Sequence, residues 1–247
     1  MEIRSLTPGD AEAIRRIAQA SLESSYSDIF DEDTILHAVE EWYSPEAFDD
    51  YLDSDEMVFC LAEEDEQPVA FSQSHVLEDI EKGRILWLHV YPDYRGRGIA
   101  TELLEATRDL LHDRGIERVT SLVIADNEEG NEFYQEHGFS KLYGRTIEIA
   151  GEEHTENVYG EPGAEPGELE PWSTPGGPEV YIDFDETNHG SKGIFFALYN
   201  DPNREDRYGW FCSNCESPDT VMDPMGRIEC TRCGNRRKAT RWDAAYL

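Results

Sequence analysis

The stretch VYPDYRGRGIATELLEATRDLL, residues 90–111, decides how the first half of this 247-residue chain folds. The run RILWLHVY (84–91), which leads into it, is almost entirely apolar or aromatic, as expected of a strand buried on both faces. The turn RGRG (95–98) follows, and apolar residues then recur at helical spacing until Gly115, a typical residue at a helix end. The stretch therefore predicts a buried strand, a glycine turn and a helix over about 98–114.

Such a turn can bind an anion. The backbone N–H groups at the start of a helix have no intrahelical partners, and the helix dipole adds partial positive charge there. A phosphate is the natural ligand, and an ordinary flexible turn is the alternative. The stretch lacks the Gly-x-x-x-x-Gly-Lys-Ser/Thr loop and the third glycine of Gly-x-Gly-x-x-Gly, so neither of these nucleotide motifs explains it.

The rest of the chain indicates two domains. Strands are expected at 2–6, 57–62, 68–77 and 118–125, helical regions after Thr7-Pro8, over 33–52 and over 127–138, and a final hairpin at 140–149 and 154–159. This pattern predicts an α+β domain over 1–160, with a mixed central sheet flanked by helices. Residues 161–178 are rich in Gly, Pro and Glu and are expected to form a linker. A small β-rich domain is expected over 179–247.

The composition is strongly acidic. There are 54 Asp and Glu against 21 Lys and Arg, only four of them lysine, which makes the net charge −33. This balance argues against nucleic acid as the default partner and is typical of a halophilic protein, an ordinary acidic protein being the alternative. The N-terminus has no signal pattern and no apolar run reaches membrane-spanning length, so no membrane association and a cytoplasmic location are expected.

Two separated motifs resemble a known family. Arg95, Gly98 and Ala100 fill the pattern Arg/Gln-x-x-Gly-x-Gly/Ala, which is the acetyl-CoA-binding motif of the GCN5-related N-acetyltransferases (GNAT). The later segment NEEGNEFYQEHGF (127–139) is similar to the second signature of that family, with Asn127 and Tyr134 in place. The resemblance covers about residues 1–160 and implies a GNAT-type fold.

The resemblance also implies roles for individual residues. The coenzyme A pyrophosphate would be surrounded by the backbone amides of Gly96, Arg97, Gly98, Ile99, Ala100 and Thr101. Main-chain groups of Leu88 and Val90 would face the pantetheine arm, and the Asn127 side chain would contact coenzyme A. Tyr134 would protonate the departing thiolate, a core tyrosine being the alternative. The acceptor is an unidentified amine: a protein N-terminus, a lysine or a small amine.

The general base stays open. Family members that use an acidic base place it where this chain has Arg84, or on the next strand, where it has Leu122. His75, Glu78 and His89 lie in suitable neighbourhoods, and a water chain or an already neutral amine would also serve. A rival hypothesis is a non-catalytic acyl-CoA sensor or adaptor.

Four of the five cysteines form two Cys-x-x-Cys pairs. Cys212 and Cys215 are separated by 14 residues from Cys230 and Cys233, close to the spacing of a four-cysteine zinc ribbon. Four thiolates leave no open coordination position, so the expected Zn²⁺ is structural, and a redox dithiol is the alternative. The fifth, Cys60, is expected in the core. The module resembles zinc-ribbon modules of halophilic archaea.

A locally basic segment overlaps the second cysteine pair. It contains Arg227, Arg232, Arg236, Arg237, Lys238 and Arg241 beside Trp242. Such a segment would suit nucleic acid or an acidic protein. The alternative is that these arginines neutralise neighbouring carboxylates.

Overall fold

The structure is a computed structural model of the chain, and it describes residues 1–77, 81–149, 152–162, 167–173, 179–222 and 227–237. The chain divides into two compact units. The first comprises Met1–Gly144 and His154–Ala164, and the second comprises Arg145–Glu153 and Glu165–Leu247. No helix among the described residues is long and apolar enough to cross a membrane.

The first unit is a layered α+β fold. Its helices are α1 (Ala11–Tyr26), α2 (Glu32–Trp42), α3 (Pro45–Leu52), α4 (Ile99–Asp113) and α5 (Glu128–Glu136), with short 3-10 turns η1 (Pro8–Asp10) and η3 (Pro92–Tyr94). Its strands are β1 (Glu2–Arg4), β2 (Met57–Glu64), β3 (Gln67–Leu77), β4 (Lys82–Val90), β5 (Arg118–Ile124), β6 (Ser140–Ile149) and β7 (Glu152–Gly160). Residues 145–153, at the tip of β6 and β7, group with the second unit.

These strands form one mixed sheet in the order β1-β2-β3-β4-β5-β7-β6. The pair β4 and β5 is parallel, whereas the pairs β2–β3, β3–β4 and β5–β7 are antiparallel. The parallel pair requires a crossover, which the turn of residues 95–98 and α4 supply. Residues 90–111 therefore form most of this crossover.

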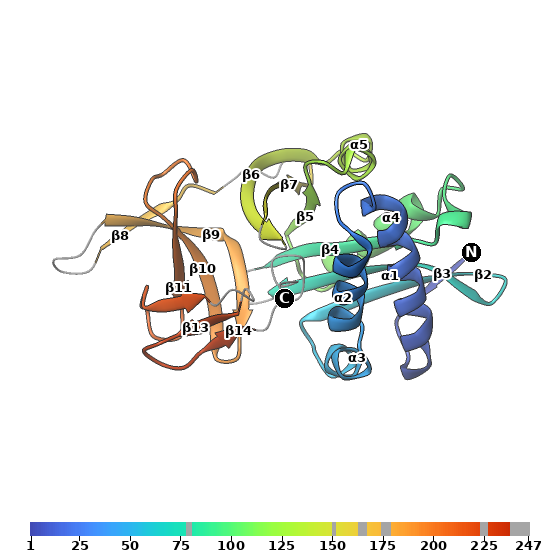
Figure 1. Ribbon diagram of the computed structural model, residues 1–247, viewed down its shortest axis with the longest axis horizontal. Coiled ribbons are helices and arrows are strands. Elements are labelled where there is room, and N and C mark those ends of the chain that lie inside the picture. The colour runs from blue at the N-terminus through green and yellow to red at the C-terminus, as the bar shows by residue number, and fades with distance from the viewer. Residues whose placement is uncertain (78–80, 150–151, 163–166, 174–178, 223–226, 238–247) are drawn as a thin grey trace. The chain divides into compact units, whose positions relative to one another are not determined.

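Helices cover both faces of the sheet. Figure 1 shows α1 and α2 side by side across one face, where Trp42 of α2 contacts Trp87 of β4 with ring centroids 5.3 Å apart. On the other face, Ile99 and Leu103 of α4 pack with Cys60 and other small buried residues of β2 and β3. The two faces are thus closed by different helices, as the buried strand pattern predicts.

Two expectations about elements need correction. The helical region expected over 33–52 is two helices, because the Ser44 hydroxyl caps α3 by accepting a hydrogen bond from the Ala47 amide at 3.2 Å, and Pro45 occupies the first helical position. Within the expected linker, Glu170–Ser173 forms strand β8, which pairs with β9.

The second unit is rich in β-structure. An antiparallel sheet has the order β11-β10-β9-β8, from β9 (Glu179–Gly190), β10 (Gly193–Tyr199) and β11 (Arg207–Cys212). A smaller sheet contains β12 (Thr220–Met222), β13 (Ile228–Cys230) and β14 (Arg236–Arg237). Among the described residues, one core cluster of this unit contains Phe195, Ala197, Tyr199, Trp210, Cys212, Ile228 and Cys230.

A buried ion cluster lies in the second unit. Glu186 is 1% exposed, and its carboxylate contacts the guanidinium groups of Arg145 and Arg207 and accepts a hydrogen bond from the Tyr199 hydroxyl at 2.6 Å. Burial alone would raise the pKa of Glu186, but the charges of Arg207 and Arg145 outweigh it, so the net pKa is lowered and the group stays ionised. The buried carboxylate of Glu186 is therefore compensated by the two guanidinium groups beside it.

Candidate active site

A cleft opens where β4 and β5 separate. Their parallel ladder ends at Ile85 and Ser121, although β4 continues to Val90 and β5 to Ile124. The cleft has a volume of about 220 Å³. It is lined by Ser21, Ser25, Leu86, Trp87, Leu88, Val90, Arg95, Ala100, Leu122, Val123, Asn127, Glu129, Gly130, Phe133 and Tyr134. Two strands that part in this way leave main-chain groups facing the gap, where an extended ligand can pair with them.

The glycine turn lies at one end of this cleft. Gly96 and Gly98 have φ of 72° and 83°, in the left-handed region that glycine adopts without steric cost, and Gly98 caps α4. The amide of Glu102 donates to the Gly98 carbonyl at 3.1 Å, so the amides of residues 99–101 precede the first helical hydrogen bond. The start of α4 therefore offers backbone amides of the kind that the predicted cradle requires.

The residues predicted to bind the cofactor are placed in different ways. Leu88, Val90 and Ala100 line the cleft, whereas the Ile99 side chain is buried in the core, which leaves only its amide for the predicted role. The Thr101 hydroxyl lies 2.8 Å from Nε2 of His137. Nδ1 of that ring lies 2.7 Å from the Phe133 carbonyl, which can only accept, so in the neutral ring Nε2 accepts from Thr101.

The two arginines of the turn differ. The Arg97 guanidinium is turned outward, 2.9 Å from the Asp93 carbonyl and 3.3 Å from Glu64, and it stacks on the Tyr94 ring at 4.8 Å. Arg95 instead lines the cleft, and burial lowers its pKa from the ordinary value. The sequence did not distinguish these two side chains.

Asn127 and Tyr134 both lie at the cleft on the α5 side. The side-chain oxygen of Asn127 caps α5 by accepting a hydrogen bond from the Gly130 amide at 3.0 Å. The side-chain NH₂ group of Asn127 donates to the Tyr26 hydroxyl at 3.0 Å. Tyr134 is 6% exposed and its ring lies 6.1 Å from the Tyr159 ring. The structure thus brings the two signature residues together on one wall.

The structure places most of the open candidates for the base. His89 is 3% exposed with Nδ1 at 3.1 Å from the Ser21 hydroxyl, and His75 lies 3.9 Å from a carboxylate oxygen of Glu56. Leu122 lines the cleft and Arg84 is half-buried on β4. Glu78 lies outside the described residues.

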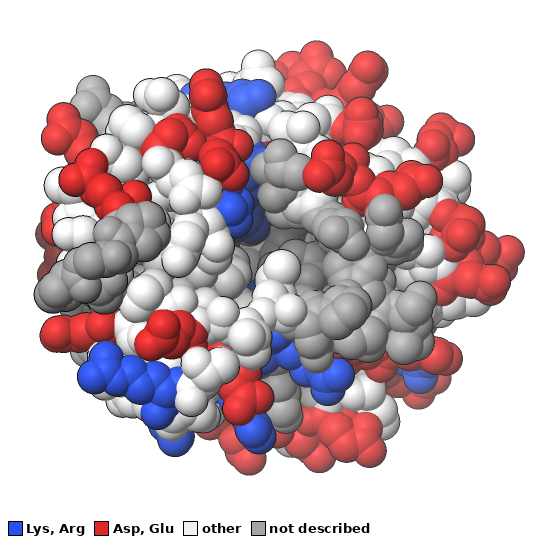
Figure 2. All heavy atoms as spheres, turned by 60° about the vertical axis from the view of Figure 1, so that its left-hand side comes forward, with Lys and Arg blue, Asp and Glu red and all other residues white. Residues whose placement is uncertain are grey.

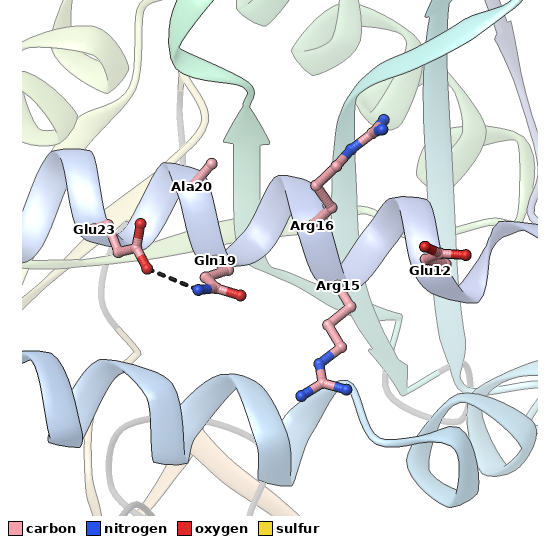
Figure 3. Close-up of a pocket in the computed structure, with 6 residues that line it drawn as sticks. All are labelled: Glu12, Arg15, Arg16, Gln19, Ala20 and Glu23. Carbon is pink, nitrogen blue, oxygen red and sulfur yellow. Dashed lines mark hydrogen bonds between the residues drawn. The ribbon is translucent and has the colours of Figure 1, made fainter.

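A second hollow lies along α1. Figure 3 shows its lining residues, which all come from that helix: Glu12, Arg15, Arg16, Gln19, Ala20 and Glu23. The hollow measures about 350 Å³, and its Gln19 and Glu23 side chains are joined by a hydrogen bond of 2.8 Å. Side chains of both charges line this hollow, as on an ordinary solvated helix face.

The four paired cysteines of the second unit meet at one point. All four Sγ atoms lie within 4.8 Å of one another, with Cys212 and Cys233 3.7 Å apart and Cys215 and Cys230 3.5 Å apart. A tetrahedron of sulfurs, each about 2.3 Å from a central ion, has edges of about 3.8 Å, so the cluster fits a zinc ion. These separations are much longer than a disulfide bond of about 2.05 Å.

Polar groups support this cluster from outside. The Asn235 NH₂ group donates to Sγ of Cys212 at 3.4 Å and to the Gly193 carbonyl at 2.9 Å. A hydrogen bond from Asn214 lowers the pKa of Cys233, whereas burial raises the pKa of Cys212 and of Cys215. Cys60 is buried elsewhere, and burial raises its thiol pKa.

The basic segment is partly neutralised. Arg236 pairs with Glu229 at 2.9 Å, and Arg237 is only 6% exposed. Lys238, Arg241 and Trp242 lie outside the described residues. The Arg236–Glu229 pair is a contact of the kind that the alternative predicts, in which the arginines neutralise neighbouring carboxylates.

Known proteins resemble both parts of the chain. Residues 14–139, about half of it, match the model of the Acetyltransferase (GNAT) family, so the chain belongs to this family. Residues 176–247 match the model described as Family of unknown function (DUF5816).

Two curated relatives differ in how much of their length this chain matches. N-alpha-acetyltransferase 30 of Schizosaccharomyces pombe is 37% identical over 60 residues, which are 24% of this chain and 40% of that protein. Spermidine N(1)-acetyltransferase of Thermoplasma acidophilum is 27% identical over 143 residues, 56% of this chain and 88% of that protein. The chain therefore spans less than half of the first relative and most of the second.

A solved structure shares the fold. PaiA N-acetyltransferase from Thermoplasma acidophilum, in complex with coenzyme A, superposes with a TM-score of 0.55 at 24% identity. The match covers 63% of this chain and 96% of that one.

Proposed function

We propose that this protein transfers the acetyl group of acetyl-CoA to an amine, and that its four clustered cysteines hold a structural zinc ion. The observation that carries the first part is the gap between β4 and β5 with the glycine turn at its end. A slender thiol ester can lie in such a gap while its diphosphate meets the amides before α4.

The chemistry follows from this placement. The neutral amine nitrogen attacks the acetyl carbonyl carbon and the carbon–sulfur bond breaks. The nitrogen gives up one proton as the amide forms, and the thiolate takes one up, so the reaction yields the amide and free coenzyme A. Alignment of the two substrates contributes about 7 to 11 kcal/mol when it is good. The amides of residues 96–101 bind the diphosphate, main-chain groups of Leu88 and Val90 hold the pantetheine arm, and Asn127 contacts coenzyme A.

Tyr134 protonates the thiolate in this proposal, because it lines the cleft and a phenol can donate. Replacing it with Phe should lower kcat by about 10² to 10⁴-fold while KM for acetyl-CoA changes little. Release of free thiol, measured in high salt, reports the reaction. Tyr208→Phe is the matched control, since Tyr208 is 45% exposed on β11.

The amine panel should include spermidine, peptides with free N-termini and a lysine peptide, the classes that the relatives' names suggest. Acetyl-CoA binding without turnover on any of them would favour the rival acyl-CoA sensor, which the absence of an acidic group at Arg84 and Leu122 keeps open. Full activity of a stable Tyr134→Phe variant would show that Tyr134 is not the proton donor and serves only in packing.

The zinc part rests on the geometry of the cysteine cluster. Four thiolates complete a tetrahedral shell, so the ion would stabilise the fold and take no part in acetyl transfer. The second unit has a modest core, and zinc binding supplies about 10 kcal/mol or more in modules of this kind.

A further inference from the structure

Arg95 is held mainly by hydroxyl groups, whereas several other arginines in the described part of the chain lie against carboxylates. Its guanidinium donates to Oγ of Ser25 at 2.9 Å, to Oγ of Ser24 at 3.2 Å and to Oγ of Ser21 at 3.2 Å. It also donates to the Ser21 carbonyl at 3.3 Å and to the Val90 carbonyl at 3.4 Å. The three serines are spaced i, i+3 and i+4 along α1, so they share one helix face.

Other arginines are compensated directly. Arg97, two residues away in the same turn, is 3.3 Å from a Glu64 oxygen. Pairs at 2.5 to 2.9 Å join Arg108 to Glu161, Arg204 to Asp183 and Arg236 to Glu229. Within the described part of the chain, the carboxylate contact of Arg95 is Glu129 at 3.9 Å, and that side chain is 86% exposed.

The difference matters because hydroxyls and carbonyls hold a guanidinium without cancelling its charge. A carboxylate in their place would form an ion pair and remove most of the positive potential from the cleft. In a chain of net charge −33, three neutral residues around one arginine preserve a local cation. Arg95 is half-buried and lines the cleft together with Val90 and Ala100, beside the glycine turn.

We propose that Ser21, Ser24 and Ser25 are positioning residues of the acetyl-CoA site, which hold Arg95 through neutral groups and so leave its positive charge available to the diphosphate of the cofactor. This inference rests on the proposed function. It places part of the cofactor site on α1, outside the motif of residues 95–100, and makes Ser25 the most informative position because its oxygen is nearest to the guanidinium.

The test places a carboxylate beside Arg95. Ser25→Asp should form an ion pair with it, so the melting temperature should stay equal or rise, while the affinity for acetyl-CoA should fall about tenfold or more. Isothermal titration calorimetry gives the affinity and a thermal melt gives the stability. Gln19→Glu adds the same charge to a half-buried position on the same helix that does not line the cleft, and it should leave the affinity unchanged.

A double-mutant cycle then identifies the mechanism. In an Arg95→Gln background, which already lacks the cation, Ser25→Asp should cost little further affinity. A purely structural role of the serine would predict the opposite pattern, with lower stability in Ser25→Asp and additive effects with Arg95→Gln.

Dephospho-coenzyme A lacks the 3′-phosphate but keeps the diphosphate. The Ser25→Asp substitution should therefore reduce the affinity for dephospho-coenzyme A by the same factor as the affinity for coenzyme A. Equal affinity of wild type and a stable Ser25→Asp variant would overturn the inference, and so would an effect confined to coenzyme A with its 3′-phosphate. Failure of the wild-type protein to bind acetyl-CoA at all would instead overturn the proposed function, so the two failures are distinguishable.

Discussion

At the scale of single residues, backbone conformation explains the glycine turn. A Cβ at Gly98 would meet nothing within 4 Å, so space does not require glycine there, whereas the φ of 83° does. Gly115 at the other end of α4 is its counterpart, with a φ of 81° and the same open surroundings. The two positions therefore match in backbone conformation and in open surroundings, and they differ in that only Gly98 lies in the turn before α4.

This pair makes a matched prediction. Gly98→Ala and Gly115→Ala should each lower the free energy of unfolding by about 1 kcal/mol, since both force an L residue into the left-handed region. Only Gly98→Ala should also weaken acetyl-CoA binding, because its strain distorts the amides before α4. Denaturant melts and calorimetric titration check the two effects, and equal binding by both variants would contradict the proposed cradle.

Asp10 carries a pH dependence. Hydrogen bonds from Arg4 lower the pKa of the Asp10 carboxyl from 3.8 to about 2, and that side chain is only 7% exposed. A folded-state pKa below the unfolded one means that this stability is complete above about pH 4 and is lost as the pH falls towards 2.

Asp10→Asn should therefore cost about 2 kcal/mol at neutral pH, and the difference from wild type should shrink below about pH 4. Urea melts of both proteins across this range, at constant salt, measure it. A difference that stays constant down to pH 3 would assign the loss to the hydrogen bond with the Thr7 amide, 2.7 Å from the carboxylate, and not to its charge.

At the scale of elements, local patterns predicted most helices and strands. The crossover from β4 through α4 to β5 follows from one apolar run, one glycine turn and one amphipathic helix, all of which are short-range signals. The break at Ser44 and Pro45 was missed because apolar residues continue at helical spacing across it, although the capping serine and proline were visible. Strand β8 was missed because Glu170 and Pro171 are residues that strands usually avoid, although proline is tolerated in a strand at the edge of a sheet.

The zinc proposal can be tested on the cysteines themselves. Cys230→Ser should remove bound zinc and unfold the second unit, because three thiolates complete the site poorly. Cys60→Ala, which alters a buried thiol outside the cluster, should keep one zinc per chain. Metal analysis and circular dichroism provide the readouts, and retention of zinc by Cys230→Ser would refute the four-cysteine site.

At the scale of the whole molecule, charge dominates. Figure 2 shows one face on which Asp and Glu are spread over most of the outline, while Lys and Arg gather in a few places. With a net charge of −33, mutual repulsion destabilises the folded chain at low ionic strength. At 1 M salt the screening length is only about 3 Å, so this repulsion is largely removed.

The melting temperature should therefore rise steeply as potassium chloride increases from about 0.1 M to several molar. Differential scanning calorimetry along this series measures the effect. A melting temperature independent of salt would contradict the halophilic interpretation and return the protein to the ordinary acidic class.

The sequence by itself determined the glycine turn and the two cysteine pairs. Both depend on residues a few positions apart, where the conformational limits of glycine and the spacing of a Cys-x-x-Cys knuckle act without help from the rest of the fold. Tertiary structure alone decided the separation of β4 from β5 and the partners of the cleft residues. Ser25 meets Arg95 across 70 positions and Tyr26 meets Asn127 across 101, because α1 packs on the sheet face beside the cleft. Contacts so distant in the chain depend on how a helix face packs across strands, which no local pattern specifies.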